Sequence, residues 1–352
     1  YRGKFDGMGH TVTLSYDMAG LAAVLGGGRI MNVKVDGVPR ADGEPCGSLA
    51  GEVGSNAMLY NCIGSAMPEG SMAGAVAGLV SGDDVLIRAC ACEEDIMAPD
   101  ADGVGGLVGA VTGDRLHVQD CRVETDFLWG GGRTGGLVGR LAGDDAQIFD
   151  CTVRSEVQGD DMTGGLVGEL SGANARITGC SCVGKTWGAP ITGGLVGSLS
   201  GVSAQVEGAS HDGLVSCWGG KIGGVVGRLS GAGAHLEDVS CSGGVVGHDA
   251  TGGFIGELAA DDFALASYTN TTPVRGDSAV MPGLIVQTKK RMAEGTPYLI
   301  GATDDGNAKM LAKMCKKEFG YAPAATFLLG AAVATNTGPN AVAIVYQGEK
   351  RR

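Results

Sequence analysis

The hydrophobic pattern of this chain is dominated by one phrase of glycine and branched aliphatic residues. Its clearest copy is Thr134-Gly135-Gly136-Leu137-Val138-Gly139-Arg140-Leu141. The second position of the glycine pair recurs at Gly20, Ser48, Ala75, Gly106, Gly136, Gly165, Gly194, Gly224 and Gly253, with spacings of 28, 27, 31, 30, 29, 29, 30 and 29 residues. So steady a period indicates stacked supersecondary units, each too small to bury its apolar face alone.

Within one repeat the pattern predicts three short strands joined by corners. In the unit that starts at residue 134, we expect strands over 135–141, 146–148 and 151–153, followed by a variable arm, Arg154–Met162, of mixed polarity. Helical repeats of this length would show a period of about 3.6 residues and would not tolerate so much glycine. The sequence therefore predicts a mainly β fold, a parallel β-helix or solenoid of about nine coils over residues 1–270.

Cysteines support this interpretation because they recur in two columns. Fifteen residues after the glycine column stand Cys90, Cys121, Cys151 and Cys180, joined after a one-residue gap by Cys62; two residues further stand Cys92, Val123, Val153, Cys182 and Cys241. Free cysteine behaves as a small hydrophobe, so we expect core packing. Cys90 and Cys92 are too close in sequence for a common structural zinc site. An odd number of cysteines does not suggest a disulfide framework. No metal or cofactor is predicted.

The composition limits the partners and divides the chain. The net charge of −13 argues against nucleic acid as the main partner, since phosphate binding needs clustered Lys and Arg. Residues 284–352 hold 10 Lys or Arg against 5 Asp or Glu, whereas residues 1–283 hold 16 against 34. We therefore expect a solenoid over 1–270, a linker over 271–283 and a small α/β domain over 284–352. No apolar run reaches the roughly 18 residues of a membrane span. The chain begins in mid-pattern at Tyr1, so we expect a piece of a longer product.

The C-terminal region has a different pattern. Pro297–Gly301 is predicted as a strand, and Asn307–Phe319 as an amphipathic helix that ends at Gly320. The segments 325–329 and 341–346 are predicted as strands on either side of a loop, Thr335–Pro339. This alternation of strands and helix is what predicts the small α/β domain.

Two known families share these motifs. Gly-Gly-Leu-Val-Gly followed by Ile-x-x-Cys resembles the GLUG repeat of bacterial surface proteins, and Phe5–Val12 resembles the coil that commonly precedes such repeats. That resemblance covers residues 1–270 and implies a right-handed parallel β-helix that is exported and displayed or attached, often in adhesive or protease-associated proteins.

The C-terminal region is similar to the C-terminal part of DegV-type fatty-acid-binding proteins. Its loop matches their Thr-His-Thr-Gly-Pro-Gly motif at Thr335, Thr337, Gly338 and Pro339, while Asn336 replaces the His and Asn340 the final Gly. The resemblance implies a fatty-acid head group at Thr335, Asn336, Thr337 and Gly338, and a cytoplasmic location if this likeness dominates. The N-terminal lobe of such proteins has no counterpart in the sequence.

Two features are candidates for surface contacts. Trp187 and Trp218 fall in successive variable arms and Trp129 two arms earlier, so they could line one side of the rod or each cover its own arm. Arg275, Gly276 and Asp277 spell an integrin-recognition tripeptide in the predicted linker, where an Arg-Gly-Asp turn is also ordinary.

Catalytic and metal-binding patterns are weak. Aspartates occupy one turn on three consecutive coils and could chelate calcium, but the column then lapses, so solvated turn residues are the preferred interpretation; they are Asp83, Asp84, Asp114, Asp144 and Asp145. Asp120, Asp150 and Asp238 look like corner residues, and the five histidines share no repeat column. The sequence thus predicts no enzyme, with a β-helix carbohydrate-active enzyme as the alternative.

These observations together predict a non-enzymatic binding or scaffold protein that is adhesin-like and secreted or displayed on a cell surface. Its variable arms would contact a host or cell-surface protein or glycan. The alternatives are fatty-acid binding through the C-terminal domain and the carbohydrate-active enzyme.

Overall fold

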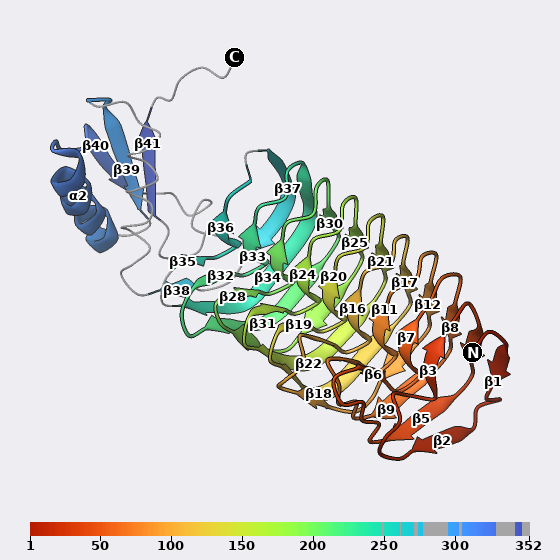
Figure 1. The fold of residues 1–352 in the computed structure, drawn as a ribbon. Coiled ribbons are helices and arrows are strands. Elements are labelled where there is room, and N and C mark those ends of the chain that lie inside the picture. The colour runs from red at the N-terminus through yellow and green to blue at the C-terminus, as the bar shows by residue number, and fades with distance from the viewer. Residues whose placement is uncertain are drawn as a thin grey trace.

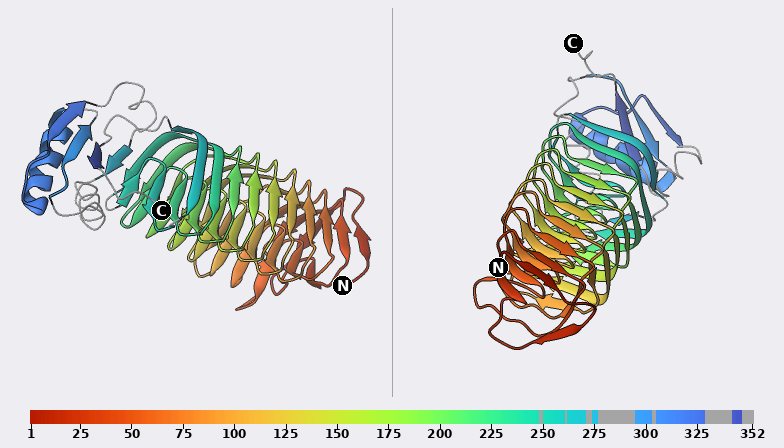
Figure 2. Two further views of the ribbon diagram at one scale, coloured as in Figure 1. Left: turned by 90° about the horizontal axis from the view of Figure 1, so that it is seen from above. Right: turned by 90° about the vertical axis from the view of Figure 1, so that its right-hand side faces the viewer.

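The structure of the protein is a computed structural model. It describes residues 1–247, 250–260, 262–270, 274–276, 295–302, 305–328 and 342–346. Parallel coils stack into an elongated rod, and a small α/β unit follows along the chain (Figure 1, Figure 2). The rod is a parallel β-solenoid, which confirms the predicted fold class.

Each complete coil contributes strands to three sheets, here called sheets I, II and III. In the coil of the clearest phrase, β19 (Arg133–Gly135) belongs to sheet I and β20 (Val138–Leu141) to sheet II. The same coil then adds β21 (Gln147–Phe149) and β22 (Thr152–Gly159) to sheet III. All of these pair in parallel with the equivalent strands of the coils before and after them.

The other strands follow the same plan. Sheet I also contains β6 (Pro45–Gly47), β10 (Met72–Gly74), β15 (Gly103–Gly105), β23 (Met162–Gly164), β28 (Ile191–Gly193), β32 (Lys221–Gly223) and β35 (Ala250–Gly252). Sheet II also contains β3 (Ala22–Leu25), β7 (Ala50–Val53), β11 (Ala77–Val80), β16 (Val108–Val111), β24 (Val167–Leu170), β29 (Val196–Leu199), β33 (Val226–Leu229) and β36 (Ile255–Leu258). The first part of sheet III contains β1 (Lys4–Asp6), β2 (Thr11–Leu14), β4 (Arg29–Met31), β5 (Lys34–Gly37), β8 (Met58–Tyr60), β9 (Ile63–Ala66), β12 (Leu86–Arg88), β13 (Ala91–Cys92), β14 (Ile96–Ala98), β17 (His117–Gln119) and β18 (Arg122–Gly130). Its remaining strands are β25 (Arg176–Thr178), β26 (Ser181–Val183), β27 (Thr186–Gly188), β30 (Gln205–Glu207), β31 (Ser210–Cys217), β34 (Ala234–Gly247), β37 (Phe263–Asn270) and β38 (Val274–Gly276).

The core is a stack of identical inward positions. Leu137, Val138 and Leu141 of one coil are fully buried, as are their counterparts in the next coils. The eleven cysteines are all buried and free, which confirms the core-packing interpretation. In the first cysteine column each thiol donates to the carbonyl two residues earlier, as Cys151 Sγ does to Phe149 O at 3.1 Å. The thiols thus fill the core and also satisfy a corner carbonyl.

Glycine in the repeated phrase is required by the closeness of successive coils. A Cβ at Gly136 would meet the carbonyl oxygen of Gly165 in the next coil. The same relation holds along the column, from Gly106 to Gly136, Gly165 to Gly194, Gly194 to Gly224 and Gly224 to Gly253. The phrase repeats because the backbone of each coil fills the space that a side chain would need.

Two columns of left-handed residues form the corners of each coil. One comprises Asn56, Asp84, Arg115, Asp145, Asn174, Ser203 and Gly233, and the other Asn32, Asn61, Ala89, Asp120, Asp150, Gly179, Gly208, Asp238 and Ser267, all with positive φ. Asparagine, aspartate and glycine tolerate this conformation best. The prediction that Asp120, Asp150 and Asp238 are corner residues is therefore confirmed.

The turn aspartates connect one coil to the next. Asp83 Oδ1 accepts the backbone N–H of Asp114 at 3.0 Å, and Asp114 Oδ1 accepts that of Asp144 at 2.9 Å. Asp144 Oδ1 in turn accepts the N–H of Ala173 at 2.8 Å. Arg115 also pairs with Asp84 at 2.8 Å, which lowers the pKa of that carboxyl. The carboxylates of Asp83, Asp114 and Asp144 lie at turns, as predicted, and they also accept backbone hydrogen bonds from the next coil.

The variable arms are part of the sheets, which corrects the expectation that they lie outside the coil strands. The arm Arg154–Met162 begins within β22, where Val157, Gln158 and Gly159 pair with residues of β18 and of β27. Inward side chains of the arms form one fully buried row, namely Ile96, Leu128, Val157, Thr186, Val215 and Val245. The arm is thus a fourth strand of the coil, and only its outward side chains are free to vary.

The C-terminal unit has the predicted order of elements. β39 (Tyr298–Ala302) pairs in parallel with β40 (Ala325–Leu328) and antiparallel with β41 (Val342–Tyr346). Helix α2 (Asp305–Phe319) connects β39 to β40 and packs Leu311 and Cys315 against Tyr298 and Ile300. Gly320, with φ of 87°, follows the last helical residue as predicted, and its N–H bonds to Lys316 O at 3.1 Å.

Candidate functional site

An outward row of side chains follows the arm strands along the rod. The parallel register places Met97, Trp129, Gln158, Trp187, Ser216, Val246 and Arg275 in line, one residue on each successive coil. We call these residues the tryptophan row. Successive members are one ladder step apart, about 4.8 Å. The row therefore confirms that Trp129 and Trp187 lie on one side of the rod.

Trp218 extends this surface beside Trp187. It follows β31 at a corner and is 76 % exposed, whereas Trp129 and Trp187 are half-buried. The rings of Trp187 and Trp218 lie 6.5 Å apart at an angle of 34°, and Lys185 Nζ lies 4.5 Å from the Trp187 ring centre. A ring as large as Trp218 rarely stays in water without a partner, so this pair is the strongest candidate for a contact surface.

The indoles present carbon to the solvent. The Nε1 atoms of Trp129 and Trp187 are buried and have no hydrogen-bond partner. The exposed part of each indole is therefore the aromatic ring, whose face carries partial negative charge. Such a surface favours stacking against apolar or weakly positive C–H groups.

The other predicted contact residues are placed differently. Arg275 and Gly276 lie in β38, which pairs with β34, so the first part of the predicted Arg-Gly-Asp site is a ladder strand, and residues 274–276 of the predicted linker belong to sheet III. Asp277 lies outside the described residues, as do Thr335, Asn336, Thr337 and Gly338 of the expected fatty-acid site.

An acidic hollow of about 350 Å³ spans three neighbouring coils near the start of their arm strands. It is lined by Glu93, Glu94, Asp95, Glu124, Thr125, Asp126 and Arg154. Several of these carboxylates have structural partners. Lys34, which donates a hydrogen bond to Glu93 at 3.0 Å, and Arg122 hold the pKa of Glu93 below its usual range. Asp95 Oδ1 accepts the backbone N–H groups of Asp126 and Phe127. The carboxylates of Glu93 and Asp95 are thus engaged in ion pairs and backbone hydrogen bonds, which suits a structural role better than proton transfer to a substrate.

The expectation that the histidines share no repeat column is wrong for His117 and His235, which sheet III aligns in one column through Gln147, Arg176 and Gln205. His211 occupies a different column. It pairs in register with Cys182 and with Cys241, in the second cysteine column, and it is almost fully buried. Its Nε2 lies 3.2 Å from Thr186 Oγ1 and its Nδ1 4.0 Å from Cys241 Sγ. Burial lowers the pKa of His211 to about 4 and raises those of Cys182 and Cys241 to about 12. The sequence alone places His211 in this column, because it stands as far after Gly194 as Cys182 does after Gly165.

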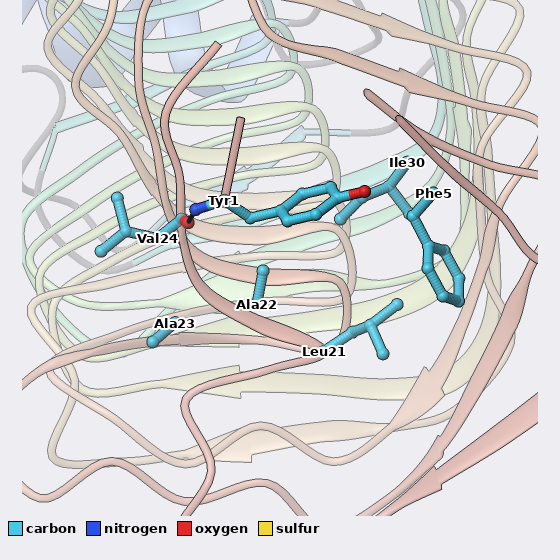
Figure 3. Close-up of a pocket in the computed structure, with 7 residues that line it drawn as sticks. All are labelled: Tyr1, Phe5, Leu21, Ala22, Ala23, Val24 and Ile30. Atoms are coloured by element: carbon cyan, nitrogen blue, oxygen red, sulfur yellow. Dashed lines mark hydrogen bonds between the residues drawn. The ribbon is translucent and has the colours of Figure 1, made fainter. Parts of the chain in front are cut away.

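An apolar pocket of about 480 Å³ opens at the first coil (Figure 3). It is lined by Tyr1, Phe5, Leu21, Ala22, Ala23, Val24 and Ile30, and the amino group of Tyr1 donates to Val24 O at 2.7 Å. Ile30 belongs to the main core, and Phe5, Leu21 and Ala22 pack against it. The pocket is thus the end of the core at this coil.

No family model, curated protein or solved structure matches the chain. Across the part of the chain that the structure describes, no helix has the length and hydrophobicity that a membrane crossing requires. The same residues contain no group of three or more His, Cys, Asp or Glu side chains arranged to hold a metal ion.

Proposed function

We propose that this chain is a non-enzymatic binding or scaffold protein whose contact surface is the tryptophan row with Trp218. One observation carries the proposal: Trp218 is 76 % exposed and packs on Trp187 in a row that continues to Trp129. Exposed aromatic residues dominate the energetics of many binding surfaces.

The distribution of variation along the coil supports the same conclusion. Inward positions repeat from coil to coil, as Val118, Ile148, Ile177 and Val206 do. Outward positions of the arm strands change in size and charge, from Phe127 to Glu156 to Lys185. A solenoid that conserves its core and varies one face has the form of a scaffold with a specialised surface.

Secretion or display on a cell surface is part of the proposal. It rests on the likeness of Gly135–Gly139 and its copies to the GLUG repeat of bacterial surface proteins. Within the acidic hollow, Glu93 is not suited to act as a general acid, because its ion pairs with Lys34 and Arg122 lower the pKa of its carboxyl.

The test is a binding screen against immobilised proteins and glycans with three versions of the chain. The wild type and Tyr60→Ala, which removes a 38 % exposed aromatic residue on β8, should give the same ligand profile. Trp187→Ala/Trp218→Ala should lose the ligands that the wild type binds. Ligands retained in full by the double variant would place the contact surface elsewhere and refute the proposal.

A second candidate function, binding of an acyl chain, is favoured by the C-terminal unit. Leu299, Phe327 and Val345 are exposed by 36 %, 40 % and 48 %, one on each strand of the three-stranded sheet. Leu299 and Val345 are directly paired, and helix α2 packs against the opposite residues Tyr298 and Ile300. This apolar face agrees with the likeness to DegV-type proteins. Mass spectrometry of an organic extract of the purified chain would reveal a bound fatty acid, and its absence would count against this candidate.

A further inference from the structure

We propose that the tryptophan row binds a neutral, β-1,4-linked polysaccharide whose chain lies parallel to the stacking axis of the coils. The inference rests on the proposed function, because it uses the same surface, and it adds the chemical class and the direction of the ligand. It follows from the spacing, the chemistry and the charge of the row.

The spacing suits a polymer of pyranose rings. Trp129 and Trp187 occupy the same position two coils apart, so their separation along the rod is about 9.6 Å. An extended β-1,4-linked chain repeats its orientation every two sugars over nearly the same length. Two sugars of one orientation could therefore meet the two indoles, and Trp218, on the coil after Trp187, offers a ring to the next part of the chain.

The chemistry of the row also fits a sugar chain. A pyranose ring in a β-linked chain has an apolar face of C–H groups and a rim of hydroxyls. The exposed ring carbons of Trp129 and Trp187 match the apolar face, since C–H groups are attracted to the face of an aromatic ring. Gln158 between the indoles and Ser216 after them are half-exposed and can exchange hydrogen bonds with the hydroxyls.

Charge selects a neutral polymer over an anionic one. Residues 1–283, which include the rod, hold 16 Lys or Arg and 34 Asp or Glu, an excess of 18 negative charges. The acidic hollow with Glu93, Glu94 and Asp95 lies near the start of the arm strands that carry the row. A polyanion approaching this surface is repelled, whereas a neutral chain is not.

A single row also suits a linear chain better than a folded protein. A standard protein interface covers about 800 Å² on each partner, with aromatic residues gathered at its centre. Here Trp129 and Trp187 follow a single line along the rod, and Trp218 lies two residues beyond that line on the next coil. The charged residues Glu156 and Lys185 precede the arm strands' inward residues on neighbouring coils. A periodic line of contacts matches a periodic ligand.

The experiment measures binding of cello-, xylo- and malto-oligosaccharides of two to six sugars, and of polygalacturonate, to the full chain by calorimetry. We expect affinity for cello- or xylo-oligosaccharides to rise from two to four sugars, as the chain comes to span both indoles. The curved α-linked malto-oligosaccharides and the anionic polygalacturonate should bind at least tenfold more weakly than the best β-linked ligand.

Variants locate the site. Trp218→Ala changes an exposed side chain and should keep the fold, and both it and Trp187→Ala should weaken binding of the best tetrasaccharide more than tenfold. Tyr60→Ala should bind like the wild type. Thermal melting of each variant separates lost binding from lost folding, and the length series on the wild type needs no variant.

Three results would overturn the inference. The polysaccharide would be rejected if no β-linked oligosaccharide bound to the chain. If a protein ligand that depends on Trp187 were found in that case, the proposed function would still hold. Oligosaccharide binding that survives both tryptophan substitutions would reject the tryptophan row as the site. Shortening of the oligosaccharides during the measurement would reject a purely non-enzymatic role.

Discussion

At the scale of single residues, the rod depends on positions where the next coil leaves no room. Gly136 and its equivalents face the carbonyl oxygen of the following coil, and the cysteine columns are buried in the core. Apart from His211, the described positions of these columns are filled mostly by small apolar residues. Their constancy is therefore a consequence of coil spacing and indicates nothing about a ligand.

Replacing Gly136 by Ala tests this argument. We expect a loss of about 3 kcal/mol in the free energy of unfolding, because the new methyl group meets the backbone of Gly165. Gly54→Ala is the matched control, since its nearest neighbours would lie at 3.4 and 3.5 Å, and it should change stability by less than about 1 kcal/mol. Urea titration measures both, and equal stability of the two variants would contradict the close-packing explanation.

His211 predicts a dependence of stability on pH. Its pKa in the folded chain is lowered to about 4 by burial, against an ordinary value of 6.5, so the folded state holds the neutral imidazole. The contribution of His211 is complete above pH 6.5 and is lost as the pH falls toward 4, because the unfolded chain then binds a proton that the folded chain refuses. The loss should amount to about 3 kcal/mol at pH 4.

The control for this prediction is His211→Val, which places in the column the residue found at Val153. Acid also changes the stability of a folded chain through its carboxylates, so the informative quantity is the difference between the two stability profiles. Denaturant titrations from pH 7 to pH 4 should show that the wild type loses more stability than the variant. Parallel profiles would show that His211 is not the group responsible.

At the scale of elements, the arm strands combine two roles. Their inward row of Leu128, Val157 and Thr186 closes the core, while their outward row carries the candidate contact surface. The alternation of inward and outward side chains along a strand makes this division possible. Function and folding are thus separated by the face of the strand rather than by the segment of chain.

Deleting residues 154–162 should consequently destabilise the rod strongly. The deletion removes the pairing of β22 with β27, most of its pairing with β18, and the burial of Val157. Replacing only the outward Arg154, Glu156 and Gln158 by Ser should leave the melting temperature within a few degrees, because surface changes away from the core are usually within about 0.5 kcal/mol. Circular dichroism during heating measures both, and a stable deletion variant would show that the arm strand is dispensable.

The sequence predicts the coils well because their constraint is local and repeated. Glycine pairs, buried aliphatic residues and turn aspartates recur at one period, so each copy reinforces the interpretation of the others. The arm strands are harder to predict, because Glu156 and Lys185 on their outward faces obscure the alternation with the buried Val157 and Thr186. The alignment of Trp129 with Trp187 depends on how many residues each corner consumes, as at the irregularity between Glu124 and Phe127, and this appears only in the register.

At the scale of the whole molecule, stability is distributed along the rod. Each coil pairs only with the coils before and after it, so the solenoid approximates a sum of coil and interface terms. The C-terminal unit has its own core, formed by Tyr298, Ile300, Leu311 and Cys315. The two parts are therefore expected to fold by separate sets of contacts.

A chain of residues 1–276, which ends with β38, should fold without the C-terminal unit. We expect a circular dichroism spectrum dominated by β-structure, from which the contribution of helix α2 has disappeared, and a melting temperature close to that of the solenoid in the full chain. The cut falls after Gly276 rather than at residue 270, because β38 still pairs with Val245, Val246 and Gly247 of β34. A chain of residues 1–270 serves as the comparison and should melt at a lower temperature, since it leaves that edge of β34 unpaired. If residues 1–276 are unfolded or aggregate while the full chain is soluble, the C-terminal unit caps the last coil, and the two parts form one cooperative structure.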